Sequence, residues 1–186
     1  VCSSDLVAKL YSHWITINYR ESYKIFASNG ILFNHESPLR GETFVTKKVV
    51  KALCNIKHNK QKKLYVGNLY SKRDWGHAQD YVKAMWKILQ HKQPDDFVIC
   101  TGKQYTIKQF INLVAQELNM KIKWKGKGIK EKAYNEKNRC IIECKRKYLR
   151  PAEVDTLKGN FSKAKKLLKW KPENDIKSLI KDMVNY

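Results

Sequence analysis

The chain has 186 residues, of which 42% are hydrophobic, and this size and composition are typical of a folded globular protein rather than a disordered one. Lys and Arg outnumber Asp and Glu by 38 to 17, which gives a formal net charge of +21. No apolar run approaches the roughly 20 residues that span a bilayer, and the amino terminus lacks the pattern of a signal peptide, so we expect a cytoplasmic protein with no membrane partner.

The surplus of positive charge has two interpretations. Phosphate contacts dominate nucleic-acid affinity, so a basic chain can indicate a nucleic-acid partner. Here the lysines are spread through every segment, and no RNP, zinc-finger or helix-turn-helix signature accompanies them. We therefore expect a solvated lysine-rich surface and no nucleic acid partner, with the charge concentrating phosphorylated small ligands. A non-catalytic basic nucleic-acid-binding module is the alternative.

The cysteines indicate reduced thiols. They are odd in number and include no CxxC pair: Cys2, Cys54, Cys100, Cys140 and Cys144. Cys140 and Cys144 lie four apart, but no second Cys/His pair completes a zinc set, so we expect no metal site.

The first part of the chain predicts helix, strand and helix. Apolar residues recur at helical spacing over 7–21, a buried strand is predicted over 24–33, and a second helix over about 43–58. Residues 1–6 do not continue the first helical pattern and match one reading frame of a common sequencing adapter. We expect them to be non-native.

The middle part continues the alternation of strands and helices. A short strand over 64–68 precedes a turn-like polar block at 72–77, a helix over 78–90 and a buried strand over 97–100. The apolar positions of the helix over 78–90 are Tyr81, Val82, Met85, Trp86 and Leu89. Thr106 is predicted to cap a helix over 107–118, whose inward residues are Phe110, Ile111, Val114 and Leu118.

The last third is rich in lysine and begins with short strands over 120–148 around a loop at 125–138. A compact polar block at 150–155 follows, and then two helices over about 162–169 and 174–184. Strands alternating with helices predict an α/β fold.

The stretch 33–48 is the focus of the functional prediction, because it lies where a predicted strand ends and a helix begins. Ligands of open α/β sheets bind in the crevice outside the carboxyl ends of strands. Asn34, His35, Arg40 and Lys48 would offer such a crevice groups for phosphates and sugar hydroxyls. The alternative is an Asx turn at Asn34 with a proline-stopped loop and solvated cations.

Two nucleotide-binding motifs can be rejected. Gly126-Lys127-Gly128 begins like a dinucleotide fingerprint, but Glu131 occupies the third glycine position. Gly102-Lys103 resembles the end of a P-loop, but Phe97 stands where its first glycine must be. Phosphate capture by side chains is left, with Arg73 and Arg150 best placed and Glu153 able to accept from ribose hydroxyls or to orient Arg150.

Several blocks then resemble GDP-mannose 4,6-dehydratases of the extended short-chain dehydrogenase/reductase family. They occur in that family's order and cover the chain from Val7 onward: Val7-Ala8-Lys9-Leu10-Tyr11, Asn29 to Pro38, Arg40-Gly41-Glu42-Thr43-Phe44-Val45-Thr46, Lys72-Arg73-Asp74-Trp75-Gly76-His77 and Arg150-Pro151-Ala152-Glu153-Val154-Asp155. The resemblance is to the carboxyl-terminal portion of that family. It implies the last part of a Rossmann-type parallel sheet over 7–186, interleaved with a smaller α/β substrate-binding domain, without the amino-terminal nucleotide-binding half.

The resemblance also implies a reaction and its residues. Family members use tightly bound NADP to convert GDP-mannose to GDP-4-dehydro-6-deoxy-mannose, the precursor of GDP-fucose and related deoxy sugars. Lys9 matches the catalytic lysine of the Tyr-x-x-x-Lys pair, which also binds the cofactor, and His35 and Arg40 match other NADP contacts. The positions that match GDP-sugar contacts are Asn34, Val45, Lys48, Arg73, Arg150 and Glu153.

The departures predict that this chain alone is inactive. Asp5 stands where the family has its catalytic tyrosine, and the glycine-rich fingerprint and the catalytic Thr and Glu are absent. Tyr70 replaces an acidic residue common before the arginine of its block, which leaves the partner of that position undefined. A sugar-nucleotide epimerase or reductase of the same fold is a further alternative. The full-length form is expected to be a homo-oligomer.

Overall fold

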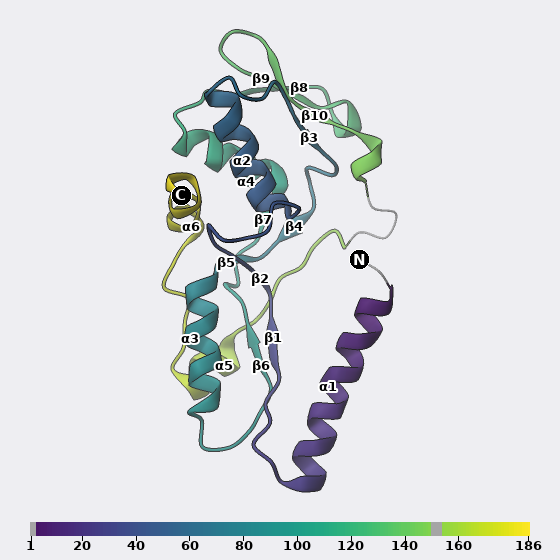
Figure 1. Ribbon diagram of the computed structural model, residues 1–186, viewed down its shortest axis with the longest axis vertical. Coiled ribbons are helices and arrows are strands. Elements are labelled where there is room, and N and C mark those ends of the chain that lie inside the picture. The colour runs from purple at the N-terminus through teal and green to yellow at the C-terminus, as the bar shows by residue number, and fades with distance from the viewer. Residues whose placement is uncertain (1–2, 150–153) are drawn as a thin grey trace.

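The computed structural model describes residues 3–149 and 154–186, which form an α/β fold (Figure 1). The helices are α1 (Ser3–Tyr23), α2 (Val45–Lys57), α3 (Ala78–Leu89), α4 (Ile107–Glu117), α5 (Ser162–Leu168) and α6 (Ile176–Asn185), with 3-10 turns η1 (Gly128–Lys130) and η2 (Arg146–Tyr148). The strands are β1 (Gly30–Leu32), β2 (Asn34–Glu36), β3 (Leu64–Val66), β4 (Lys72–Arg73), β5 (Trp75–His77), β6 (Phe97–Ile99), β7 (Tyr105–Thr106), β8 (Lys123–Lys125), β9 (Lys132–Tyr134) and β10 (Cys140–Cys144).

One part of the fold is built on two short parallel pairs. Strand β1 pairs with β6, and β2 pairs with β5. The segment from β1 to β2 therefore pairs first with one strand and then, after Phe33, with another. Helices α3 and α5 both contact β6 (Figure 1). Tyr81, Phe97, Ile99 and Trp170 are buried in the core that these elements enclose. This arrangement confirms the predicted α/β class with parallel strands.

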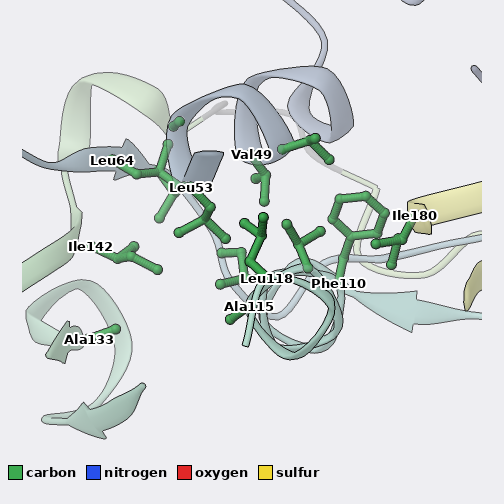
Figure 2. Close-up of a cluster of buried hydrophobic side chains, with 14 of the residues drawn as sticks. Val49, Leu53, Leu64, Phe110, Ala115, Leu118, Ala133, Ile142 and Ile180 are labelled. Carbon is green, nitrogen blue, oxygen red and sulfur yellow. The ribbon is translucent and has the colours of Figure 1, made fainter. Parts of the chain in front are cut away.

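The other part is a mixed four-stranded sheet, in the order β3-β10-β9-β8, together with α2, α4 and α6. Strand β3 is parallel to β10, while β9 is antiparallel to both β10 and β8. The core between sheet and helices contains Leu53 and Val49 of α2, Phe110 of α4 and Ile180 of α6 (Figure 2).

Most predicted helices are confirmed, and α4 shows why. Thr106 accepts a hydrogen bond from Gln109 N at 3.0 Å, and the Gln109 side chain accepts one from Thr106 N at 2.8 Å, which is a complete capping box. Its predicted inward residues, Phe110, Ile111, Val114 and Leu118, are all buried. The helices predicted over 7–21, 43–58, 78–90, 162–169 and 174–184 correspond to α1, α2, α3, α5 and α6.

The predicted strand over 24–33 is only partly right. Strand β1 begins at Gly30, and Ile25 and Phe26 are each 45% exposed. Strand pairing resumes directly after Phe33, so the start of the polar block is strand β2 and not a loop. An apolar run cannot by itself show which of its residues find a hydrogen-bonded neighbour.

Two further predictions need correction. The block at 72–77 is not a turn, because it contains β4 and β5, which pair with β7 and β2. The predicted loop at 125–138 contains η1 and β9. Strands β4, β5 and β9 have only two or three residues each, which is too few for local periodicity to identify them, and the partners of β4 and β5 lie far along the chain.

Helix α1 is amphipathic in sequence but touches the rest of the fold chiefly near its carboxyl end. Arg20 pairs with Asp96, with Nη1 at 2.8 Å from Oδ1, and also donates to the Ala27 carbonyl at 3.1 Å. Asn29 Nδ2 donates to the carbonyl oxygen of His13 at 3.3 Å. Within the described residues, no helix is long and apolar enough to cross a membrane.

Candidate functional site

The predicted site begins at the β2–β5 pair. Asn34 is the register partner of Trp75, His35 of Gly76 and Glu36 of His77. Because the two strands are parallel, both carboxyl ends face the same edge, and α3 starts directly after β5 there. Asn34 and His35 are half-buried within strand β2, whereas the sequence placed them in the crevice after a strand that ends at residue 33.

The imidazole of His35 is held on two sides. Its Nδ1 lies 2.9 Å from the carbonyl oxygen of Phe33. Its ring packs against Tyr81 of α3, with centroids 4.9 Å apart and planes inclined by 31°. Burial raises the pKa of the Tyr81 hydroxyl, so that group is neutral.

Glu36 is a buried carboxylate that organises the loop between β2 and α2. Its Oε2 accepts a hydrogen bond from Thr46 Oγ1 at 2.6 Å and lies 3.1 Å from Arg40 Nε. The guanidinium carbon of Arg40 lies 3.5 Å from the centroid of the Phe44 ring. Burial raises the pKa of Glu36, although the Thr46 hydroxyl and Arg40 oppose that shift. Arg40, a predicted cofactor contact, is thus held by residues of its own loop.

Lys48 of α2 borders a cavity of about 270 Å³ between α2, β3 and η2. Its ammonium lies 4.0 Å from the centroid of the Tyr148 ring. Two other lysines at the cavity are neutralised by carboxylates, because Lys51 donates to Glu42, and Lys63 Nζ lies 3.2 Å from Glu143 Oε2. The remaining lining residues are Ala52, Asn55, Gln61, Leu64 and Tyr65. Lys48 therefore offers this cavity a cation, and its ammonium group can leave the face of the Tyr148 ring to bind an anion.

Arg73 lies on β4, and its guanidinium donates to backbone carbonyls. Arg73 Nη1 donates to the Lys72 carbonyl at 2.8 Å and to the Val154 carbonyl at 2.6 Å. Val154 is the first described residue after the segment 150–153, so the predicted contacts Arg150 and Glu153 lie outside the described residues.

Asp74 is buried between β4 and β5. It accepts hydrogen bonds from Thr101 N at 2.9 Å, Thr101 Oγ1 at 2.6 Å and Gly102 N at 2.8 Å. Charged acceptors of this kind give strong hydrogen bonds, and these join β4 and β5 to the loop after β6.

Tyr70, whose partner the sequence left undefined, donates to Glu131 Oε2. Lys108 donates to the other oxygen of the same buried carboxylate. Burial opposes ionisation of Glu131, but the bonds from Lys108 and Tyr70 outweigh it and hold the pKa of Glu131 below its usual range. The tyrosine thus joins the segment before Arg73 to the η1–β9 region.

The structure brings only some of the predicted residues together. Asn34 and His35 are neighbours on β2, while Val45 begins α2 and packs, partly buried, against the core. Of the predicted residues, the cavity at α2 holds Lys48. Lys9 is exposed on α1 and pairs with none of the other predicted residues in the described part of the chain. A single cavity shared by Asn34, Lys48 and Arg73 is therefore still a prediction.

The sequence did not predict three residues that contact the candidate groups: Phe44 at Arg40, Tyr81 at His35 and Tyr148 at Lys48. Phe44 lies four residues after Arg40, but the segment between them is not helical, so this spacing does not mark the contact. Tyr81 and Tyr148 reach their partners only through tertiary folding, and no local pattern marks them.

Comparison with solved structures defines the class of protein. The chain superposes on the structure of RMD from Pseudomonas aeruginosa complexed with NADPH with a TM-score of 0.79 at 21% identity, covering 96% of this chain and 54% of that one. For UDP-N-acetylglucosamine 4-epimerase from Methanobrevibacter ruminantium the TM-score is 0.77 at 18% identity, covering 99% and 53%. The fold is therefore of the Rossmann-type α/β class with parallel strands, which this chain shares with both structures.

Sequence comparison identifies the family within that class. The family model of GDP-mannose 4,6 dehydratase matches residues 6–183. The chain is 51% identical over 178 residues to GDP-mannose 4,6 dehydratase 2 of Caenorhabditis elegans, covering 96% of this chain and 47% of that protein. It is 49% identical over 179 residues to GDP-mannose 4,6 dehydratase of Dictyostelium discoideum, covering 96% and 50%. This chain belongs to the GDP-mannose 4,6-dehydratase family, and it spans about half the length of these relatives.

Proposed function

We propose that this chain is the carboxyl-terminal portion of an NADP-dependent GDP-mannose 4,6-dehydratase, a hydro-lyase that forms GDP-4-dehydro-6-deoxy-mannose. The observation that carries the proposal is the family match over residues 6–183 with about 50% identity to named dehydratases. Its work would be to hold the guanosine diphosphate sugar and to complete the surroundings of the cofactor's nicotinamide.

In this proposal the sugar nucleotide is held by side chains instead of a glycine-rich loop. Lys48 and Arg73 supply cationic donors, and Asn34 supplies neutral hydrogen bonds from the edge of β2. The cavity beside Lys48 has aromatic walls at Tyr65 and Tyr148, which suits a flat heterocycle at one end of the ligand. Val45, Arg150 and Glu153 complete the proposed substrate contacts.

The residues present also fit NADP. Its nicotinamide supplies the site that takes up and returns a hydride. His35 is half-buried with one ring nitrogen engaged by the backbone, so its other nitrogen can bind a polar group of the ligand. Lys9 and Arg40 would add positive charge toward the cofactor. Because the 186 residues contain no complete glycine-rich fingerprint, we expect this chain alone to produce no 4-keto sugar from GDP-mannose and NADP.

Nucleotide selectivity tests the proposal. We expect GDP to raise the melting temperature of the chain, and UDP at the same concentration to raise it less, since bound ligand stabilises the folded state by mass action. Lys48→Ala should weaken GDP binding roughly ten- to hundredfold, because a charge-assisted hydrogen bond contributes about 1.5–3 kcal/mol. Thermal unfolding with each nucleotide measures the first effect, and calorimetric titration measures the second.

Lys165→Ala is the matched control for that experiment, because Lys165 is exposed on α5 and its removal changes the net charge equally. Equal protection by GDP and UDP would favour an epimerase or reductase of the same fold. Salt-sensitive binding of labelled RNA with no response to GDP would instead favour a basic nucleic-acid-binding module.

Cellular setting and assembly complete the proposal. The described cysteines, Cys54, Cys100, Cys140 and Cys144, are all free thiols, which supports a reducing compartment such as the cytoplasm. We propose a homo-oligomeric full-length protein on family grounds alone.

A further inference from the structure

His35 is fixed in one tautomer by its contact with the backbone. A carbonyl oxygen can only accept a hydrogen bond, so the Nδ1 that lies 2.9 Å from the Phe33 carbonyl must carry a proton. In a neutral imidazole the second nitrogen then carries a lone pair. The Nε2 of His35 is therefore a hydrogen-bond acceptor.

Tyr81 supports the imidazole, and a glycine makes room for it. Register partners of parallel strands point to the same face, and the partner of His35 is Gly76. A Cβ atom at Gly76 would lie 2.5 Å from Cε2 of Tyr81, far inside a normal contact. The absence of a side chain at Gly76 thus lets the Tyr81 ring pass under the strand and reach His35.

The ring of Tyr81, and not its hydroxyl, makes the contact. Tyr81 is 0% exposed, and its ring is fixed further by an edge contact with Trp170 at 6.5 Å between centroids. Among the described residues its hydroxyl has no hydrogen-bond partner. Packing against a fully buried ring removes rotational freedom from His35 before any ligand binds.

We propose that Tyr81 is a positioning residue that presents Nε2 of His35 as an acceptor for an N–H or O–H donor of the ligand. This inference rests on the proposed function for the identity of that ligand. There the primary amide of the nicotinamide is the matching donor, since its nitrogen carries two hydrogens.

Nitrogen-15 NMR of the imidazoles in the 186-residue chain tests the tautomer without any ligand. At about pH 8.5, where ordinary imidazoles are neutral, His35 should show a protonated Nδ1 and an unprotonated Nε2. His77 is an internal contrast, because its Nδ1 accepts from Gln79 N at 3.2 Å and its Nε2 lies 3.1 Å from Asp182 Oδ2. It should show the opposite pattern. An Nε2–H tautomer at His35 overturns the inference and leaves the GDP result untouched.

Two variants then test Tyr81. Tyr81→Phe keeps the ring and should preserve the His35 pattern, whereas Tyr81→Leu should bring the two nitrogen shifts of His35 toward each other while His77 is unchanged. A pattern retained in Tyr81→Leu, or lost in Tyr81→Phe, contradicts the positioning role. If Tyr81→Leu does not fold, the ring-current shift of the His35 protons in the unsubstituted chain decides, and its absence overturns the contact.

The donor is tested with NADP and with its nicotinic acid analogue, which lacks the amide hydrogens. NADP should move the Nε2 resonance of His35, and the analogue should move it much less. Equal shifts contradict the amide as donor. No shift with either compound contradicts the cofactor contact, and with it that part of the proposed function, even if the tautomer is as inferred.

Discussion

Asp74→Ala is expected to lower the free energy of unfolding by about 3–5 kcal/mol, because it removes the acceptor of several buried hydrogen bonds at once. The carboxylate is 0% exposed and accepts from the Thr101 amide, the Thr101 hydroxyl and the Gly102 amide. Alanine leaves these donors without a partner and opens space between β5 and the loop after β6. For a chain of this size the loss corresponds to a melting temperature lower by roughly 6–20 °C.

Urea unfolding of both proteins measures this effect directly. Asp74→Asn should also destabilise the folded state, because the NH2 group of asparagine can face the donors of Thr101 and Gly102 that now bind the carboxylate. Asp155→Ala is the control, since Asp155 is exposed near the same strand, and a surface substitution of this kind usually changes stability by about 0.5 kcal/mol or less. A loss under about 1 kcal/mol for Asp74→Ala would show that the loop relaxes to satisfy its own amides.

The Asp74→Ala substitution should also weaken GDP binding. Asp74 lies between Arg73, a proposed substrate contact, and Trp75, the register partner of Asn34. Displacing it should loosen both sides of the proposed GDP site, so GDP protection should fall more than in a variant of equal stability loss elsewhere in the core, such as Leu179→Ala of α6.

Local sequence signals identified the elements whose stabilising contacts are local. Helix α4 was predicted together with its cap and its buried face, because Thr106, Gln109 and the apolar spacing all lie within that helix. For α3 the apolar positions predicted the helix, but most of them do not lie on its buried face. Val82 and Trp86 are 61% and 62% exposed, while Ala84 and Ile88 are buried. When both sides of a helix are apolar, periodicity predicts the helix and not the side that packs.

The candidate site shows the same difference between local and long-range contacts. The resemblance marked Asn34, His35 and Lys48 because these residues lie in continuous blocks. The partners that hold the candidate groups come from elsewhere in the chain, as with Tyr148 at Lys48 or Glu131 at Tyr70. Such contacts depend on how strands of two or three residues pair, and these strands have too few residues to show a period of their own.

The attachment of α1 is expected to fail in acid. Helix α1 carries Lys9, and the Arg20–Asp96 pair holds the helix to the start of β6. Burial alone would raise the pKa of Asp96, but hydrogen bonds from Arg20 and Asn29 outweigh burial and lower the pKa from 3.8 to about 2. A carboxyl group with a depressed folded pKa stabilises the fold above its unfolded pKa, and this contribution disappears as the pH falls through the folded value.

The window for this loss therefore runs from about pH 4 down to about pH 2, and the contribution at neutral pH is on the order of 2 kcal/mol. The Asn29 amide, which donates to Asp96 Oδ1 at 2.9 Å, reports the titration by NMR. At pH 7, Asp96→Asn should reproduce the acid state and speed hydrogen exchange along α1. Glu21→Gln, an exposed neighbour on the same helix, should not. A titration midpoint near 4, or unchanged exchange in Asp96→Asn, would mean that other contacts hold the helix and that Lys9 does not depend on this pair for its place.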